Sequence, residues 1–226
     1  MNGIRESIVS NLLTEDRWKM MAEGLGVTVE ISLLSLLLAT LIGALICAMR
    51  MSRKRTISRL AKFYIELMRS LPLLLLLLVM FYLVFASSGL DKIHITVLCF
   101  SLYFGAYISE IFRSGIEGVD KGQWEAGAAL GMSKGLVLRK IVLPQMLLRI
   151  LPVYKNQMAA LIKATSIVGY VSVMDLTKAS DYVRSRTFDA FFPLLMTALV
   201  YLLLSWLFGL AADALEKRLT PKRRAL

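Results

Sequence analysis

Ionisable and hydroxyl side chains interrupt the apolar stretches of this sequence at a few positions where they could meet a bound molecule. Lys163 stands in the middle of the apolar segment QMAALIKATSIVGYVSVM, and Thr165 and Ser166 follow it. Charged groups within a bilayer are costly, so they mark a polar cavity or a partner. Lys163 could neutralise a substrate carboxylate or pair with an acid on another helix, and we favour the pair. The two hydroxyls could equally hydrogen-bond within a helix bundle. Glu30, in another apolar stretch, completes the candidates for a polar pathway.

The sequence contains no complete motif for hydrolytic or nucleotide-binding chemistry. HExxH and the phosphate-binding loop GxxxxGK[ST] are missing. The letters GMSKG at 131–135 match GxSxG, but they lie between two predicted helices and so do not form the strand-to-helix elbow of a hydrolase. The only histidine, His94, is expected at the water boundary of an apolar stretch, which leaves no Ser/His/Asp triad. Cys47 and Cys99 lie in apolar runs, so a disulfide framework or a thiolate metal site is not expected. We therefore predict no catalytic, cofactor or metal site, and ATP-driven work would require an ATPase on another chain.

The segment EAGAALGMSKGLVLRKIVLP, from Glu125 to Pro144, is cationic and rich in small residues. Its first part predicts a short helix whose small side chains let another surface approach; these are Ala126, Gly127, Ala128 and Ala129. Gly131 suits a helix stop with positive φ, and Ser133 can cap a second helix that Pro144 kinks or ends. The apolar residues of this second helix are expected to face inward; these are Val137, Leu138, Ile141 and Val142. The segment is either an interfacial amphipathic connector or a docking element. Glu125 favours docking, because an acid stabilises the N-terminus of a helix and could meet a basic partner.

The composition places this segment within a membrane protein. Of the 226 residues, 57% are hydrophobic, and the mean hydropathy is +0.65. The formal net charge of +11 would suggest nucleic acid for a soluble protein. Here the basic residues lie between apolar runs, as they do in the cytoplasmic loops of integral membrane proteins, so no nucleic acid is expected.

Five apolar segments could each cross a hydrocarbon core of about 30 Å, which requires roughly 20 helical residues. They lie at 24–49, 71–86, 93–112, 157–174 and 191–212. The second is short, and the fourth contains Lys163. We expect an all-α integral membrane protein that forms one domain, 1–226, without internal repeats.

The distribution of charge predicts the orientation of these spans. The connections 50–69 and 113–149 are strongly basic, whereas 87–94 and 175–189 carry little net charge. The C-terminal tail is also basic, with Lys217, Arg218, Lys222, Arg223 and Arg224. Because cationic loops stay in the cytoplasm, we expect the N-terminus outside, the C-terminus inside, and 113–149 as a cytoplasmic coupling loop.

The same loop resembles the membrane permease of binding-protein-dependent ABC importers. The pattern of that family is Glu-Ala-Ala, three residues, Gly, nine residues, then Ile-x-Leu-Pro. It is met by Glu125, Ala126, Gly131, Ile141, Leu143 and Pro144 at the same spacing. Gly127 departs from the usual Ala; it keeps the surface small but weakens the helix by about 1 kcal/mol. The resemblance implies that these seven residues form or support an ATPase-docking element.

Flanking segments resemble the permeases for polar amino acids within that family. The segments are VTVEISLLSLLLATLIGAL, GQWEAGAALGMS and LIKATSIVGYVSVMDLT, although the group usually has an acid where this chain has Ala164. The resemblance implies a type I importer permease in the lipid of a bacterial inner membrane. It also implies an identical or related second permease, ATPase subunits that bind ATP and Mg²⁺, an extracytoplasmic binding protein and an amino acid substrate.

The alternative is a transporter or channel subunit that works without ATP. Ion-coupled carriers usually contain paired repeats with interrupted helices, and this sequence shows no repeat. The particular amino acid stays open.

Overall fold

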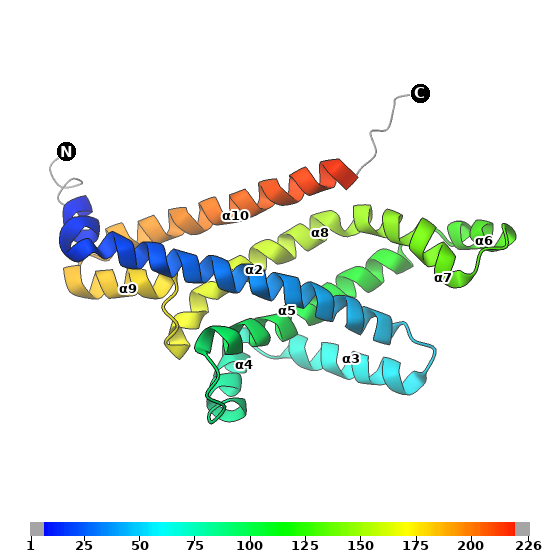
Figure 1. The fold of residues 1–226 in the computed structure, drawn as a ribbon, viewed down its shortest axis with the longest axis horizontal. Coiled ribbons are helices and arrows are strands. Elements are labelled where there is room, and N and C mark those ends of the chain that lie inside the picture. The colour runs from blue at the N-terminus through cyan, green and yellow to red at the C-terminus, as the bar shows by residue number, and fades with distance from the viewer. Residues whose placement is uncertain (1–6, 220–226) are drawn as a thin grey trace.

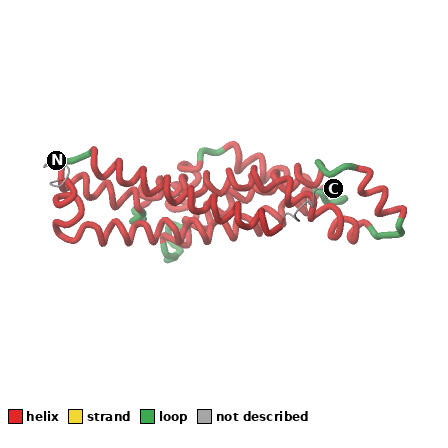
Figure 2. Tube along the Cα trace, turned by 90° about the horizontal axis from the view of Figure 1, so that it is seen from above, coloured by secondary structure: helices red, strands yellow, loops and turns green. Residues whose placement is uncertain are grey.

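The computed structural model describes residues 7–219, and every regular element in that range is helical. Four long helices run along the long axis of the molecule: α2 Arg17–Arg50, α5 Lys92–Glu117, α8 Leu143–Ala164 and α10 Phe191–Leu219 (Figure 1). Seen from above they form an elongated bundle (Figure 2). The last basic residues of the predicted tail, from 220 onward, lie outside the described part of the chain. The all-helical prediction is confirmed.

Three described segments are long and apolar enough to cross a membrane, namely Val9–Arg50, Lys92–Glu117 and Phe191–Ala214. They overlap the first, third and fifth predicted spans. The first includes a short entry, η1 Val9–Leu13 and η2 Thr14–Asp16, before α2. Many leucines of α2 and α10 are exposed within this single chain. Such surfaces suit contact with lipid or with another subunit.

The second predicted span, 71–86, corresponds to the helical residues 73–84, formed by α4 Leu73–Val79 and η3 Met80–Val84. The segment before it is also helical, α3 Arg55–Ser70, and the two helical parts meet at an angle of 106°. Pro72 explains the break, because a residue before proline avoids the helical region; Leu71 has φ −91° and ψ 137°. If this bent pair counts as one span, four described segments could cross the membrane.

The helix that contains the fourth predicted span, 157–174, begins earlier in the chain than expected. α8 begins at Leu143, and at Thr165 it gives way to the 3₁₀ turn η5 Thr165–Val171. Pro144 therefore stands in the first turn of α8, where a missing N–H costs little, directly after the π-helical turn η4 Leu138–Val142. Of the two outcomes expected for it, a kink or an end, the end is not found. The predicted loop 113–149 is correspondingly shorter, since α5 continues to Glu117 and α8 takes up the residues from 143.

The core depends on a close approach of α2 and α5. A side chain at Gly43 would place its Cβ 2.7 Å from Ile108 Cγ2, and one at Gly105 would lie 2.8 Å from Ile42 Cγ2. Ala39 and Ile108 are fully buried in the same contact region. Ala39 and Gly43 of the first span therefore pack within the subunit, where they bring two backbones together.

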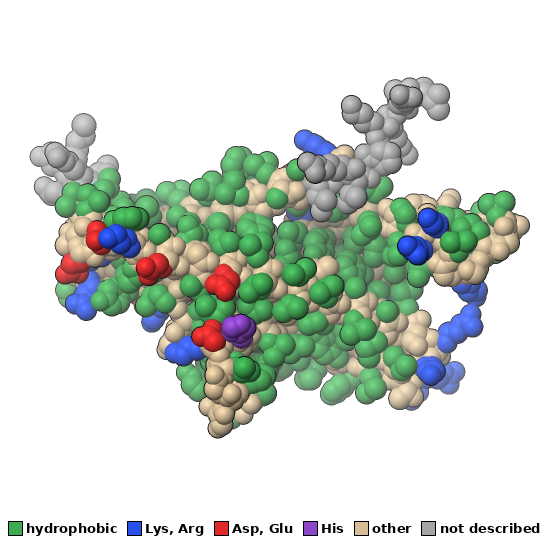
Figure 3. Space-filling view, in the orientation of Figure 1, with side chains coloured by type: hydrophobic (Ala, Val, Ile, Leu, Met, Phe, Trp, Pro, Cys, Tyr) green, Lys and Arg blue, Asp and Glu red, His purple; other side chains and the backbone are tan. Residues whose placement is uncertain are grey.

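The connections gather at the two ends of the bundle. The turn from α2 to α3 and the segment with α6 Lys121–Ala129 and α7 Lys134–Val137 lie at one end (Figure 1). The start of the described chain and α9 Leu176–Thr187 lie at the other. On the visible face, the α6–α7 end and the nearby turn from α2 to α3 show Lys and Arg without Asp or Glu, whereas the opposite end shows Asp and Glu together with Lys and Arg (Figure 3).

Candidate functional site: the α6–α7 segment

α6 is a short helix whose two ends are both closed by hydrogen bonds. At its start, the Asp120 carboxylate accepts from the backbone N–H of Gly122 at 2.7 Å. At its end, Gly131 N–H donates to Ala128 C=O at 2.9 Å, and Met132 N–H donates to Gly127 C=O at 3.0 Å. This pair of bonds is a Schellman motif, which requires a left-handed residue. Gly131 supplies it with φ +74°, as the sequence predicted.

The chain then turns back through a second helix toward the bundle. Ser133 caps α7, and its hydroxyl accepts from Leu136 N–H at 3.4 Å. The π-helical turn η4 Leu138–Val142 joins α7 to α8. One side of this segment packs on a buried cluster that includes Ile116, Val137 and Val142. The predicted inward face of the second helix, with Val137, Leu138, Ile141 and Val142, is therefore confirmed.

Gly127 is the point where α6 and α7 meet most closely. It is buried, and a Cβ there would lie 2.6 Å from Val137 Cγ2 and 3.4 Å from Ile141 Cδ1. No real Cβ tolerates the shorter distance without a shift of its neighbour. Gly127 thus lets the two helices pack, and its side faces the interior of the segment.

The seven predicted docking residues therefore divide into two groups. Glu125, Ala126, Gly131 and Pro144 are exposed. Gly127 is buried, while Ile141 and Leu143 are partly buried and pack on the apolar cluster beneath the segment. The contacts of these three residues lie within the chain, so they do not themselves present a docking surface. Their place in the fold is to hold α6 and the exposed residues in position. The docking role of the motif stays a prediction.

Two further contacts fix the segment to α8. Arg149 donates a hydrogen bond to Gly118 C=O at 2.5 Å, and its guanidinium covers Gly118, whose Cβ would lie 2.8 Å from Arg149 Nε. Gln145 Nε2 donates to Gln123 Oε1 at 3.2 Å. The end of α5, the start of α6 and the first turns of α8 are thus joined by polar side chains that the motif does not include.

The predicted pathway residues are not gathered into one site. Lys163 and Glu30 are exposed, and neither forms an ion pair with another residue of the described chain. The predicted pair between Lys163 and an acid on another span is therefore not found there. Ser166 is bonded to Lys163 C=O, and the buried Thr165 hydroxyl donates to Ile162 C=O at 2.7 Å. Both hydroxyls make the local helix bonds that were the simpler expectation.

A buried polar cluster at the opposite end of the bundle was missed from the sequence. Asp175 is fully buried and caps α9, accepting from Thr177 N–H and Lys178 N–H at 3.0 Å each. The Tyr201 hydroxyl contacts the Asp175 carboxylate at 3.3 Å and the Thr177 hydroxyl at 3.0 Å. Burial raises the pKa of Asp175, and the hydrogen bonds to its carboxylate partly oppose that shift.

This cluster joins α9 to the first long helix. The Thr28 hydroxyl accepts from Leu176 N–H at 3.1 Å, so it satisfies a free donor at the start of α9. Gly24 allows the approach, because a Cβ there would lie 2.7 Å from Asp175 O. The sequence contained a signal, an Asp directly before a helix, but its distant partners could not be inferred from spacing.

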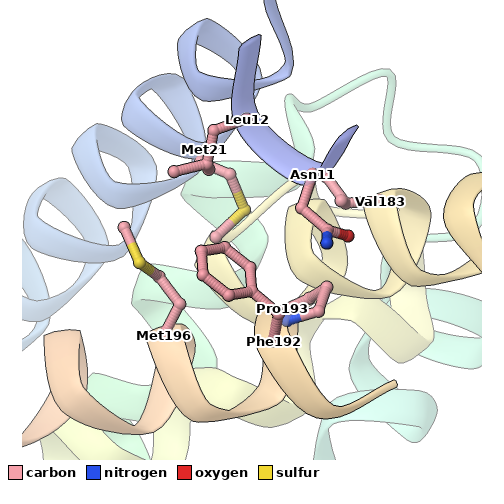
Figure 4. A pocket seen from close by; sticks show the side chains of 7 residues that line it. All are labelled: Asn11, Leu12, Met21, Val183, Phe192, Pro193 and Met196. Carbon is pink, nitrogen blue, oxygen red and sulfur yellow. The ribbon is translucent and has the colours of Figure 1, made fainter. Parts of the chain in front are cut away.

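A second contact at the same end surrounds Asn11, as Figure 4 shows. Asn11 Nδ2 donates to Asp189 Oδ2 at 2.8 Å, and Asp189 also caps the start of α10 through Phe191 N–H at 3.0 Å. These bonds lower the pKa of Asp189. The neighbouring side chains of Met21, Val183, Phe192, Pro193 and Met196 leave no room for a water molecule. The contact therefore anchors the entry of the chain and offers no binding cavity.

Comparison with known proteins finds membrane subunits of transport systems by both sequence and structure. Residues 19–221 match the family described as "Binding-protein-dependent transport system inner membrane component". GlnP of Rickettsia bellii, a permease protein assigned provisionally to a glutamine transport system, is 36% identical over 87% of this chain and 91% of its own length. The L-cystine transport system permease protein TcyB of Bacillus subtilis is 31% identical over 92% and 90%. A crystal structure of an amino acid ABC transporter with histidines superposes with a TM-score of 0.81 at 31% identity, covering 91% of this chain and 97% of the other.

Proposed function

Because the chain belongs to the family of binding-protein-dependent transport system inner membrane components, we propose that it forms the transmembrane pathway of an ATP-driven amino acid importer. It is a multi-pass permease of the inner membrane with the fold of type I importer permeases. In this proposal, α6 receives the force of a partner ATPase and passes it to the long helices. ATP and Mg²⁺ bind on that partner, and this chain carries force without catalysing hydrolysis.

The observation that carries the proposal is the construction of α6. The helix is closed at both ends, it stands at the far end of the bundle, and its exposed residues include the small Ala126, Ala128 and Ala129. A contact that transmits motion must be rigid and must allow a partner to approach closely. Gly127 and Arg149 supply rigidity, since they fix α6 on α7 and on α8.

The charge distribution supports a cytoplasmic place for α6. On the visible face, Lys and Arg are accompanied by Asp and Glu at the opposite end but not at the α6–α7 end (Figure 3), and the positive-inside rule puts an end with a cationic excess in the cytoplasm. The N-terminus and α9 would then face outward, where an extracytoplasmic binding protein delivers the substrate. A second permease, identical or related, would cover part of the exposed leucines of α2 and α10.

The substrate is proposed at the level of a class. The relatives named above are assigned to glutamine and to L-cystine, so similar identities accompany different amino acids. The pathway residues Lys163, Thr165, Ser166 and Glu30 remain part of the proposal. Lys163 is exposed in the single subunit, which fits contact with a substrate carboxylate or with the second permease.

The test uses the complex with its ATPase and binding protein, reconstituted in liposomes. Gly131→Trp replaces a left-handed glycine at the end of α6, and Glu125→Lys reverses the charge on its exposed surface. We expect both variants to insert in the membrane but to lose substrate uptake while ATP hydrolysis becomes independent of the binding protein. Gly135→Trp is the control, because Gly135 is exposed with open space around it and no positive φ. Wild-type uptake by the Gly131→Trp complex would reject the docking role of α6.

A further inference from the structure

Basic side chains gather where the chain turns from α2 into α3. Six Lys and Arg lie within residues 50–62, and residues 31–65 contain no acid. Four of the six are exposed and form no ion pair with another residue of the described chain; these are Arg53, Lys54, Arg55 and Arg59. We call these four residues the turn patch. Their positive charge is not compensated within the part of the chain that the structure describes.

The start of α3 adds to the concentration of positive charge. Lys54 is the N-cap residue of α3 and makes no capping hydrogen bond with its side chain, and the first turn contains no acid. The N-terminus of a helix carries partial positive charge, so basic residues there are unfavourable by themselves. The side chains of the turn patch therefore repel one another and the end of the helix, and an anion bound among them would relieve this repulsion.

A stripe of large apolar side chains continues from the turn patch along α3. Leu60, Phe63 and Leu67 have exposed fractions of 60%, 65% and 41%. Their spacing of three and four residues places them on one side of the helix. Ala61 and Ile65 are buried on the side that packs on the bundle. One side of α3 is therefore held by the bundle, and the apolar stripe is left exposed by the described chain.

The turn patch and the stripe lie in the order of the two parts of a lipid molecule. α2 belongs to a segment that is long and apolar enough to cross a membrane and that ends at Arg50, so the turn after it lies at a membrane surface. α3 runs back alongside α2 (Figure 1), and residues 60 to 67 therefore lie progressively farther from that surface. Phe63 is about 12 Å along the helix axis from the start of α3. Charge at the surface with apolar length below it matches a phospholipid headgroup and its acyl chains.

We propose that the start of α3 binds an anionic phospholipid, with the phosphate on the turn patch and an acyl chain along Leu60, Phe63 and Leu67. Three of the four patch residues are arginines, whose guanidinium groups bind phosphate oxygens through two parallel hydrogen bonds. The inference rests on insertion of the subunit in the membrane. It does not depend on ATP-driven transport, and it adds a ligand that the proposed function does not include.

An anionic lipid fits this surface better than free phosphate or a water-soluble partner does. Free phosphate would use the turn patch alone and would leave the apolar stripe without a role. A water-soluble partner would meet the patch but not the stripe, which runs into the depth of the membrane. The other basic segment, with Lys134, Arg139 and Lys140, differs because α6 and α7 extend beyond the α2–α3 turn along the long axis (Figure 1). It therefore supplies a control at the same end of the molecule.

The first experiment measures lipid bound to the purified permease by native mass spectrometry. The probes are anionic phosphatidylglycerol and zwitterionic phosphatidylcholine with the same acyl chains. We expect the wild type to prefer phosphatidylglycerol. The patch variant, Arg53→Gln with Lys54→Gln and Arg55→Gln, should bind it at least about tenfold more weakly, since each basic residue near an anionic headgroup contributes roughly fivefold.

The matched control removes the same charge from the other basic segment. Lys134→Gln with Arg139→Gln and Lys140→Gln should bind phosphatidylglycerol as the wild type does. Equal losses of affinity in the two triple variants would show a general effect of net charge and would overturn the proposal. A wild type without preference between the two lipids would overturn it as well.

A variant that keeps the charge guards against a loss caused by misfolding. Arg53→Lys with Arg55→Lys retains every positive charge but removes the paired hydrogen bonds of the guanidinium group. Its affinity for phosphatidylglycerol should lie between those of the wild type and the patch variant. An affinity as low as that of the patch variant would contradict a role for charge. Excess inorganic phosphate at constant ionic strength should not displace the lipid, and full displacement would assign the turn patch to free phosphate.

Tryptophan fluorescence locates the acyl chain. In a background with phenylalanine at Trp18, Trp124 and Trp206, the three tryptophans of the chain, Phe63→Trp places a reporter on the stripe. Leu202→Trp is the control, because α10 lies on the opposite side of the bundle and Leu202 is exposed to a similar 67% (Figure 1). Each reporter is quenched with brominated phosphatidylglycerol and with brominated phosphatidylcholine. The ratio of the two quenching efficiencies does not depend on the depth of the reporter.

We expect this ratio to be at least about threefold higher for Phe63→Trp than for Leu202→Trp. Adding the three substitutions of the patch variant should remove the difference. The same ratio at both positions in the protein with an intact turn patch would overturn the proposal.

The assembled complex shows whether another subunit covers the stripe. The Phe63→Trp reporter is measured again in liposomes with the ATPase, the binding protein and the second permease present. Quenching by brominated phosphatidylglycerol should persist, and its loss on assembly would overturn the proposal in favour of a protein contact. If the complex hydrolyses no ATP and transports no amino acid, the proposed function fails, while preferential lipid binding by the isolated permease would still support this inference.

Discussion

The hydroxyl of Tyr201 on α10 donates a hydrogen bond to the carboxylate of Asp175, 3.3 Å away at the start of α9. The carboxylate is nevertheless fully buried, and burial raises its pKa above the ordinary value of 3.8. A group whose pKa is higher in the folded state binds its proton more tightly there. Its contribution to stability is therefore fully present below about pH 4 and is lost as the pH rises through the folded-state pKa.

Asp175→Asn should remove this pH dependence. Asparagine still caps a helix, so α9 should remain folded, and the variant should gain stability relative to the wild type as the pH rises above about 4. Thermal unfolding of both proteins in detergent across a pH series gives the difference. A difference that does not change with pH would show that Asp175 does not titrate in the folded protein.

Gly127→Ala should destabilise the α6–α7 contact, although alanine favours a helix by about 1 kcal/mol. The new Cβ would lie 2.6 Å from Val137 Cγ2, and overpacking of this kind costs about 1–3 kcal/mol. Hydrogen exchange of the α6 amides should therefore become faster. The double variant with Val137→Ala should recover protection, and simple additivity of the two changes would contradict the contact.

Gly105→Leu should separate α2 from α5. Its Cβ would lie 2.8 Å from Ile42 Cγ2, and the added side chain would have no space between the helices. We expect a loss of about 3 kcal/mol or more, with aggregation in detergent. Gly26→Leu is the matched control, because nothing lies within 4 Å of its Cβ. Similar behaviour of the two variants in size-exclusion chromatography and thermal unfolding would count against the packing.

Lys163→Met should leave the subunit folded, because Lys163 is exposed and has no ion-pair partner in the described chain. We expect a change in stability within about 0.5 kcal/mol and a raised KM for uptake. Lys155→Met makes a useful contrast, since it removes the partner of Asp213 on α10. Loss of permease assembly in Lys163→Met with normal substrate affinity would remove Lys163 from the pathway.

Local rules predicted the parts of the site that depend on neighbouring residues. The left-handed Gly131, the Ser133 cap and the inward face of the second helix follow from spacings of a few residues, and the structure contains all three. The direction of Gly127 did not follow, because it depends on how α6 lies on Val137. Motif membership alone gave it the same role as Glu125.

The side-chain contacts between helices that are distant in the sequence could not be predicted, for a related reason. Tyr201 reaches Asp175 from another helix, and Thr28 reaches Leu176 from the first. No periodicity links such partners. The earlier start of α8 was missed for a different reason. Pro144 was expected to kink or end the second helix, whereas it stands in the first turn of α8, where proline is equally well accommodated.

The sharp break between α3 and α4 at Leu71 and Pro72 also has a consequence for how this part of the subunit is solvated. Helix ends leave backbone carbonyl and N–H groups without helical partners, and hydrocarbon offers none to replace them. At this elbow, the charged helix α3 ends with Arg69 and Ser70, and the apolar helix α4 begins at Leu73. The elbow must therefore rest against solvent or another protein surface. The hydrocarbon-facing surface of this subunit is therefore not continuous, because it is interrupted where α3 meets α4.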